Sequence, residues 1–255
     1  MTALSVNLNA VAQLRNRRNL PWPSVVGVGR AVLAAGANGI TIHPRPDERH
    51  IRRADVFELE AMLRTEFPDA EYNIEGYPSE AFLALVEASR PDQVTFVPDD
   101  PAQATSDHGW DVAANHELLA RSIDVMKALG IRASVFIDAD PSVPAAAWEV
   151  GADRVEFYTG PYGATYGTTT GPDELNKLSE TASAVRAVGH HASGTRPPLC
   201  INAGHDLTLA NLPAFLEAVA GVEEVSIGHA ITADALMVGF PEAVRRYLAI
   251  LASPT

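Results

Sequence analysis

The stretch GITIHPRPDERHIRRADVFELEAMLRTEFPDAEYNIE, residues 39–75, decides the fold. It begins with a short β-branched run (39–43), continues with a segment of helical apolar periodicity (54–65) and ends in a second short run (72–75). A strand, a helix and another strand in this order predict a β-α-β unit, the building block of a parallel sheet.

The same alternation runs along the whole chain. Short apolar runs predict eight strands, over residues 4–8, 39–43, 72–75, 94–97, 132–137, 154–157, 199–202 and 224–227. Helical patterns lie between them, over residues 24–35, 54–65, 79–88, 115–129, 174–188, 209–220 and 233–251. Two polar, glycine-rich stretches, 158–172 and 189–198, are longer than ordinary connections, so we expect lids or interface segments there.

Eight alternations over 255 residues, with no break in composition, predict one α/β domain over residues 1–255 with the (β/α)8 TIM-barrel fold. The strands look nearly continuously apolar, which is typical of parallel strands buried on both faces. An open doubly wound sheet is the alternative. It is disfavoured because no G-x-G-x-x-G motif follows the first strand to hold a dinucleotide.

Composition excludes several classes of protein. A net charge of −13 argues against a surface that captures nucleic acid. No apolar run is long enough to span a membrane and the N-terminus lacks a secretory signal, so we expect a cytoplasmic protein without a membrane partner. The single cysteine, Cys200, rules out an internal disulfide and a cysteine metal cluster, and its neighbours predict burial in a strand.

The basic residues are 17 arginines and two lysines, and arginines gather in residues 15–18 and 45–53. Because the planar guanidinium suits phosphate, these clusters point to small anionic substrates, with solvated salt bridges as the alternative.

Active sites of such barrels form where the strands end, so the polar residues there are the candidates. They are Asn7, His43, Arg45, Glu75, Thr105, Ser106, Asp138, Glu156, Asn202, His205, Gly228 and His229. Each alone could be a cap or a satisfied core residue, but their convergence on one mouth predicts a site.

The available chemistry is narrowed by what is missing. Neither Lys127 nor Lys177 falls at a strand end, so an imine on the enzyme has no candidate, and no G-x-S-x-G nucleophile exists. Acid–base catalysis remains, by His43, Glu75, His205 and Glu156. No H-E-x-x-H motif is present, so the spacing of these residues predicts no metal site within one stretch of sequence, although ligands from separate strands could still form one.

Two glycine turns, NAGH (202–205) and SIGH (226–229), each close a strand before a helical pattern. Such turns predict phosphate cradles, because backbone N–H groups and a helix N-terminus can face an anion. Arg18, Arg45 and His50 could build a second anion site. Two phosphate sites suggest the condensation of two small phosphorylated substrates.

Several longer motifs resemble the pyridoxine 5′-phosphate synthase family. They follow one another over nearly the whole chain: VNLN and LRNRR within 6–18, GITIHPRPDERHI (39–51), NIEG (73–76), TFVPD (95–99), SVFID (134–138), GADRVEFYTGPY (151–162), INAGHDL (201–207) and VSIGHA (225–230).

The resemblance implies a barrel with extra helices, a homo-octamer, and condensation of 1-deoxy-D-xylulose 5-phosphate with 3-amino-2-oxopropyl phosphate to pyridoxine 5′-phosphate, phosphate and water. It implies no metal or organic cofactor, and an imine between the two substrates. His43 and Glu75 match proton acceptors, His205 matches a proton donor, and Glu156 matches a carboxylate that supports charged intermediates.

The resemblance also implies contacts to the two phosphates. The residues that match contacts to the amino-ketone phosphate are Asn7, Arg18, Gly228 and His229, and those that match contacts to the deoxyxylulose phosphate are Arg45, His50 and Ser106.

Three positions depart from the family pattern. Asn9-Ala10 stands in place of Asp-His on the deoxyxylulose side, Ser106 replaces Thr, and Asp206 replaces a glycine beside the amino-ketone phosphate. A carboxylate there would repel a phosphate. We therefore expect the Asp206 side chain to cap the helix predicted near Leu209, leaving its backbone N–H for the phosphate. Two alternatives remain, a sugar-phosphate epimerase or lyase and a phosphosugar-binding barrel without catalysis.

Overall fold

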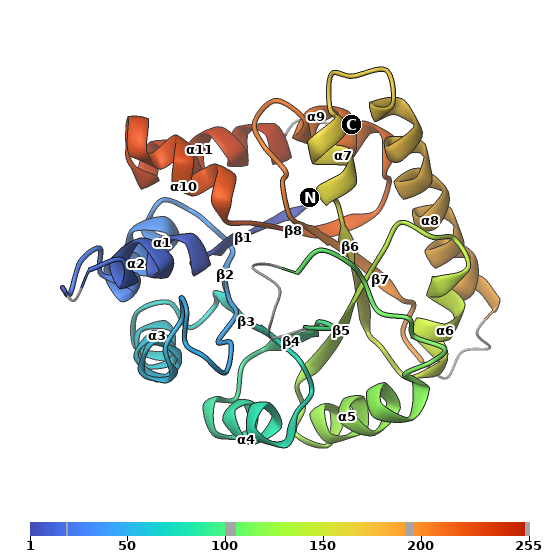
Figure 1. Ribbon diagram of the computed structural model, residues 1–255, viewed down its shortest axis with the longest axis horizontal. Coiled ribbons are helices and arrows are strands. Elements are labelled where there is room, and N and C mark those ends of the chain that lie inside the picture. Colours follow the sequence, from blue (N-terminus) through green and yellow to red (C-terminus); the bar gives the residue numbers. More distant parts are fainter. Residues whose placement is uncertain (19, 100–105, 192–195, 253–255) are drawn as a thin grey trace.

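The computed structural model describes residues 1–18, 20–99, 106–191 and 196–252, and its strands form one closed barrel. All neighbours pair in parallel, and β8 closes the barrel against β1 (Figure 1). The predicted (β/α)8 barrel is therefore confirmed. The strands are β1 (Ala3–Asn7), β2 (Gly39–Ile42), β3 (Glu71–Gly76), β4 (Gln93–Phe96), β5 (Arg132–Ile137), β6 (Arg154–Tyr158), β7 (Cys200–Gly204) and β8 (Val222–Ile227).

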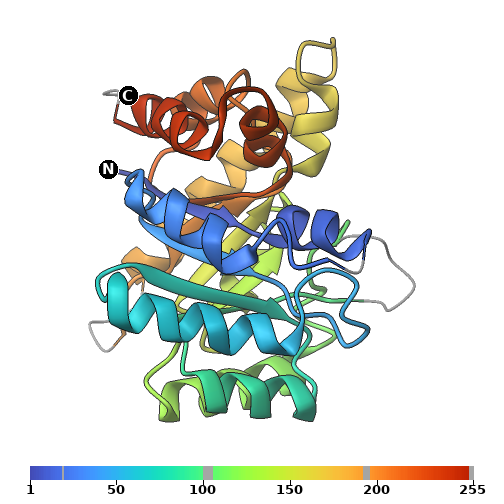
Figure 2. The same cartoon turned by 90° about the vertical axis from the view of Figure 1, so that its left-hand side faces the viewer.

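Helices surround the barrel, and the C-terminal helices α10 and α11 lie on the opposite side of it from α4 (Figure 2). Two helices instead of one follow each of β1, β6 and β8, so the barrel has extra helices. The helices are α1 (Asn9–Asn16), α2 (Val25–Ala34), α3 (Arg53–Glu66), α4 (Glu80–Ser89), α5 (His116–Ala128), α6 (Val143–Glu149), α7 (Gly160–Thr165), α8 (Gly171–His191), α9 (Leu212–Ala218), α10 (His229–Val238) and α11 (Phe240–Leu251).

Serine marks the starts of two helices, at the residues where the predicted helical patterns 24–35 and 79–88 begin. The hydroxyl of Ser24 accepts from the N–H of Gly27 at 3.0 Å, and that of Ser79 accepts from Phe82 at 3.2 Å. Each bond satisfies an N–H group that has no partner inside the helix, so α2 and α4 begin directly after these residues.

Other element predictions were wrong. The pattern over 233–251 forms two helices, because Gly239 has a φ of +81° that interrupts the helical backbone. The stretch 158–172, expected to be a long connection, contains α7.

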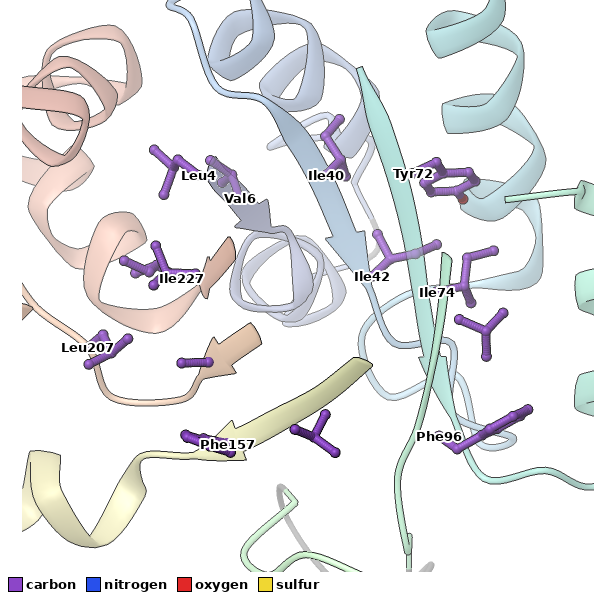
Figure 3. Packing of buried hydrophobic residues seen from close by; sticks show 14 of the residues in the cluster. Leu4, Val6, Ile40, Ile42, Tyr72, Ile74, Phe96, Phe157, Leu207 and Ile227 are labelled. Carbon is purple, nitrogen blue, oxygen red and sulfur yellow. The ribbon is translucent and has the colours of Figure 1, made fainter. Parts of the chain in front are cut away.

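The two faces of the strands differ in chemistry. The outward side chains are apolar and pack against the helices, as Figure 3 shows for Leu4, Ile40, Ile74 and others. Polar side chains predominate on the inward face, and those that are buried include Ser5, Thr41, Asn73, Gln93, Thr95, Ser134, Glu156, Asn202, Glu224 and Ser226. Burial on both faces is as predicted, but the prediction that these strands are nearly continuously apolar was wrong.

Hydrogen bonds join these inward side chains. Ser5 Oγ lies 2.7 Å from Thr41 Oγ1, Asn73 Nδ2 donates to Thr41 at 3.3 Å, and Thr95 Oγ1 lies 3.3 Å from both Asn73 Oδ1 and Glu156 Oε2. The last contact joins β4 to β6 through the barrel interior, because these strands are not neighbours. The interior is thus a hydrogen-bonded polar core that leads to the mouth.

Cys200 opens β7 and is only partly buried, so the prediction of a buried cysteine was too strong. Desolvation and the neighbouring Glu223 raise the pKa of its thiol to about 11, which keeps the thiol protonated. None of the helices in the described ranges combines the length and apolar composition needed to cross a membrane.

Candidate active site

The carboxyl ends of the strands surround a cavity of about 450 Å³. The predicted site residues that line it are Asn7, Asn9, His43, Arg45, His50, Glu75, Ser106, Glu156, His205, Asp206, Gly228 and His229. Residues far apart in the sequence are thus brought to one place, as the strand-end pattern predicts.

His43 follows β2 directly and lies between two carboxylates. Its Nδ1 is 3.6 Å from Glu75 Oε2, and its Nε2 hydrogen-bonds Asp99 Oδ2. Burial alone would raise the pKa of Asp99, but the hydrogen bond from His43 and the charges of His43 and Arg45 outweigh it and lower that pKa. Asp99 is therefore ionised at neutral pH, so Nε2 of His43 is the donor and Nδ1 faces Glu75.

Glu75 comes near the end of β3 and is buried, and its Oε2 accepts from Asn7 Nδ2 at 3.4 Å. Burial, together with the negative charges of Glu156 and Asp99, raises the pKa of Glu75 well above its usual range. Once ionised, a carboxylate with a raised pKa is a stronger base than an ordinary carboxylate, which suits a general base.

Glu156 is the third buried carboxyl of the cavity. Burial raises its pKa to about 7, although the Thr95 hydroxyl and His205 both act to lower it. Its position depends on Gly204 in β7, because a Cβ at Gly204 would lie 2.2 Å from Glu156 Oε1. Because Gly204 has no side chain, the Glu156 carboxyl has room beside it.

The loop after β2 carries Arg45 and His50. Arg45 Nη2 donates to Asp99 Oδ1 at 2.8 Å, and Ser106 Oγ bonds the same oxygen at 3.1 Å. His50 is buried; desolvation, then the positive charges around it, lower its pKa to about 4. Its Nδ1 accepts from the N–H of Ile51 at 2.9 Å, so the neutral ring offers Nε2–H as a donor.

Asn9 holds His43 in place through the backbone. Its Oδ1 accepts from the N–H of His43 at 2.9 Å, while its own N–H donates to Asn7 Oδ1 at 2.9 Å. The side-chain amide of Asn9 therefore holds the backbone at the end of β2.

His205 and Asp206 follow β7 and face each other. His205 Nδ1 lies 3.0 Å from Asp206 Oδ2. The predicted helix cap is wrong: α9 begins at Leu212, and the residue at its N-cap is Asn211. Asn211 instead donates its Nδ2 to the backbone oxygen of Asp206 at 3.0 Å, so the Asp206 side chain is left to pair with His205.

The two glycine turns differ. Gly228 and His229 follow β8, and α10 begins at His229, so a helix N-terminus opens at the cavity. A Cβ at Gly228 would lie 3.0 Å from Asn7 Cβ, which explains the glycine. The turn over 202–205 is not followed by a helix until Leu212, so the prediction of a helix N-terminus there was wrong.

Comparison with known families adds a decisive observation. A model of the family described as pyridoxal phosphate biosynthesis protein PdxJ matches residues 4–253. The chain belongs to the PdxJ family. The chain is similar to proteins named pyridoxine 5′-phosphate synthase from Brucella anthropi, at 58% identity over 98% of both chains, and from Chelativorans sp., at 57% over 96% of both.

Solved structures of other proteins share the fold. Tryptophan synthase from M. tuberculosis matches with a TM-score of 0.64 at 12% identity, over 99% of this chain and 93% of that one. The YdjI aldolase from Escherichia coli K12 matches with a TM-score of 0.61 at 12% identity, over 96% and 86%. Identities as low as these show only that the barrel fold is shared, whereas the family model and the similar proteins show the PdxJ family.

Three predicted residues of this PdxJ member are not among the described residues that line the cavity, namely Arg18, Asp138 and Asn202. Arg18 is exposed, so its contact with a phosphate stays a prediction. Thr105 lies outside the described residues. The neighbouring Arg15 is structural, because its guanidinium pairs with buried Asp55 at 2.5 Å.

Sequence reasoning missed Asp99 in this PdxJ member. It follows β4 by a short step, in the motif TFVPD, and binds both His43 and Arg45. The available signal was a carboxylate two residues past the strand predicted over 94–97. In the described part of the chain, no group of three or more His, Cys, Asp and Glu residues is arranged to hold a metal ion.

Proposed function

We propose that this PdxJ member condenses 1-deoxy-D-xylulose 5-phosphate with 3-amino-2-oxopropyl phosphate, giving pyridoxine 5′-phosphate, phosphate and water by acid–base catalysis. The observation that carries the proposal is the placement of His43 between Glu75 and Asp99 inside the cavity. The names of the similar proteins and the motifs along the chain support the choice of substrates.

Glu75 and His43 act as proton acceptors. Ionised Asp99 accepts from Nε2–H of His43 and so orients the ring with Nδ1 directed to Glu75, where Nδ1 is the acceptor of the neutral ring. A proton taken from substrate by Glu75 can therefore pass to His43 over 3.6 Å with a small movement of either side chain. Asn7 holds the same oxygen of Glu75 in position.

Glu156 supports charged intermediates. With a pKa of about 7, it can be ionised when a cationic imine forms and can hold a proton when the site is neutral. His205, which follows β7, serves as the proton donor for the water and phosphate that leave. The imine joins the two substrates, since neither lysine lines the cavity.

Two anion sites divide the substrates. The N-terminus of α10 with Gly228 and His229 binds the amino-ketone phosphate, because free N–H groups there face an anion. Arg45, Ser106 and the Nε2–H of His50 bind the deoxyxylulose phosphate, and Asn9 and Asp206 contact the substrates from the rim. We also propose a cytoplasmic homo-octamer, in which Arg18 completes a phosphate contact.

The direct test is incubation of purified protein with both phosphorylated substrates. Pyridoxine 5′-phosphate and inorganic phosphate should appear only when both are present. Conversion of one substrate alone would indicate an epimerase or lyase instead, and saturable binding without turnover would indicate a phosphosugar-binding protein.

Borohydride tests where the imine forms. If the two substrates are joined to each other, reduction during turnover should yield a small-molecule amine and leave the mass of the intact protein unchanged. An adduct on Lys127 or Lys177 would contradict this assignment.

A further inference from the structure

The turn that carries His205 has an uncommon backbone. His205 and Asp206 have φ angles of +79° and +55°, a region that side chains other than glycine rarely occupy. Neighbouring elements hold this turn: the Thr159 hydroxyl bonds the backbone oxygens of Gly204, at 2.8 Å, and of His205, while Asn211 bonds that of Asp206. Two successive residues kept in this region indicate that the turn serves the site.

Residues of neighbouring elements pack against the side chains of this turn. The ring of Tyr158 meets that of His205 edge-on, with centroids 5.1 Å apart and planes at 81°. On the other side, α7 approaches with Gly163, where a Cβ would lie 2.6 Å from the Cβ of Asp206. Position 163 therefore leaves room for the carboxylate of Asp206 beside His205.

The hydrogen bond from His205, opposed by partial burial, lowers the pKa of the Asp206 carboxyl. An ionised carboxylate 3.0 Å from Nδ1 accepts a hydrogen bond and keeps a proton on that nitrogen. His205 lines the cavity, and with Nδ1 held by Asp206 its ring would serve a substrate through Nε2.

We propose that Asp206 is a positioning residue for His205. Its carboxylate holds the ring through Nδ1–H, so that Nε2 of the protonated ring gives the proton to the leaving group. This inference rests on the proposed function of His205 as proton donor. Because the resemblance expects glycine at position 206, the pairing is a feature of this chain.

The pairing has a cost for binding. Asp206 also lines the cavity near His229, beside the proposed site of the amino-ketone phosphate. A carboxylate there repels the phosphate, so the same residue that orients His205 weakens this substrate. The two effects act on different kinetic constants, kcat and KM.

The kinetic test compares Asp206→Gly and Asp206→Asn with the wild type. Glycine adopts the φ of this position freely, and asparagine keeps an acceptor without the charge. We expect kcat to fall about fivefold in Asp206→Gly and about twofold in Asp206→Asn, below the ~10²-fold loss for removing an acid–base group, because the pair is partly exposed. KM for 3-amino-2-oxopropyl phosphate should stay equal or fall.

Asp140→Asn is the matched control, since it removes another exposed carboxylate from the same end of the barrel outside the cavity, and kcat should not change. An unchanged kcat in Asp206→Gly, or a raised KM with equal kcat, would overturn the proposal.

A second measurement does not depend on turnover. In ¹⁵N-histidine-labelled protein, the His205 ring, assigned with His205→Gln, should carry its proton on Nδ1 in the neutral form and shift toward Nε2–H in Asp206→Gly. An identical tautomer in both proteins would show that Asp206 does not hold the ring. Should the wild type form no pyridoxine 5′-phosphate while this shift is seen, the proposed function fails and the pairing stands.

Discussion

The two histidines of the cavity are held in contrasting ways. His43 has a side chain that is 5% exposed, two carboxylate neighbours and a backbone N–H bound by Asn9. His205 has a side chain that is 26% exposed, a carboxylate neighbour in Asp206 and a left-handed backbone. The first is fixed by burial and charge, and the second by the shape of its turn.

This difference teaches where substitution should matter most. Electrostatic interactions are stronger where water is excluded, so each carboxylate around His43 has more influence than Asp206 has on His205. His43 also has little freedom to move, because Asn9 binds its backbone N–H while Asn7 binds Glu75 and Arg45 binds Asp99. The His205 side can reorient when its turn changes.

The largest effect should come from Glu75→Gln on the His43 side. The amide keeps the shape but cannot take up a proton, so kcat should fall by ~10² or more while the fold is kept. Glu71→Gln, at the other end of the same strand, is the control and should stay within about threefold of the wild type. Turnover of Glu75→Gln in that same range would remove Glu75 from the mechanism.

Glu156 interacts electrostatically with Glu75, next to His43, and with His205. Its titration should make the stability of the protein depend on pH. Its pKa is about 7 in the folded chain against an ordinary value of 4.5, so its stabilising contribution is present below about pH 4.5 and is lost as pH rises through 7. Between pH 5 and 8, the unfolding free energy of the wild type should fall relative to Glu156→Gln by on the order of 2 kcal/mol. Urea titrations at several pH values measure this, and parallel pH curves would contradict it.

Asp99→Asn removes the charge that orients His43 and partners Arg45. We expect kcat to fall about tenfold and KM for the deoxyxylulose phosphate to change as Arg45 reorients, because a buried charged hydrogen bond is lost. Steady-state kinetics with each substrate varied in turn give both constants. A loss no larger than that of Asp206→Asn would remove the contrast between the two histidines.

The smallest effect should come from Tyr158→Phe on the His205 side. The edge-on contact with His205 uses the ring and not the hydroxyl, so kcat should stay within about threefold. Tyr158→Leu, which removes the ring, should lower kcat further. Equal values for the two variants would show that ring packing does not hold His205.

Much of the fold followed from local patterns. The β-branched runs and the amphipathic segments between them are enough to specify a barrel, and the polar residues at strand ends were recognisable because strand ends of a parallel barrel share one face. His43 and Glu75 were found in this way. Each predicted strand overlaps a strand of the structure.

The rest depends on geometry that a pattern does not contain. Asp99 lies past its strand, and only the course of the backbone brings it to His43. The cap expected of Asp206 required a helix start near Leu209, whereas the chain turns through two left-handed residues and starts α9 later. The polar interior does have a signal in the sequence, the alternation of apolar and polar residues in VNLN and ITIH.

The polar interior of the barrel has a consequence for calorimetry. Exposure of apolar surface raises the heat capacity on unfolding, while exposure of polar surface lowers it. Here the helices cover an apolar outer face, but unfolding also releases side chains such as Thr41, Asn73 and Asn202 from the inside. The heat-capacity increment per residue should therefore be smaller than for a barrel filled with aliphatic side chains, and the curve of stability against temperature should be correspondingly flatter.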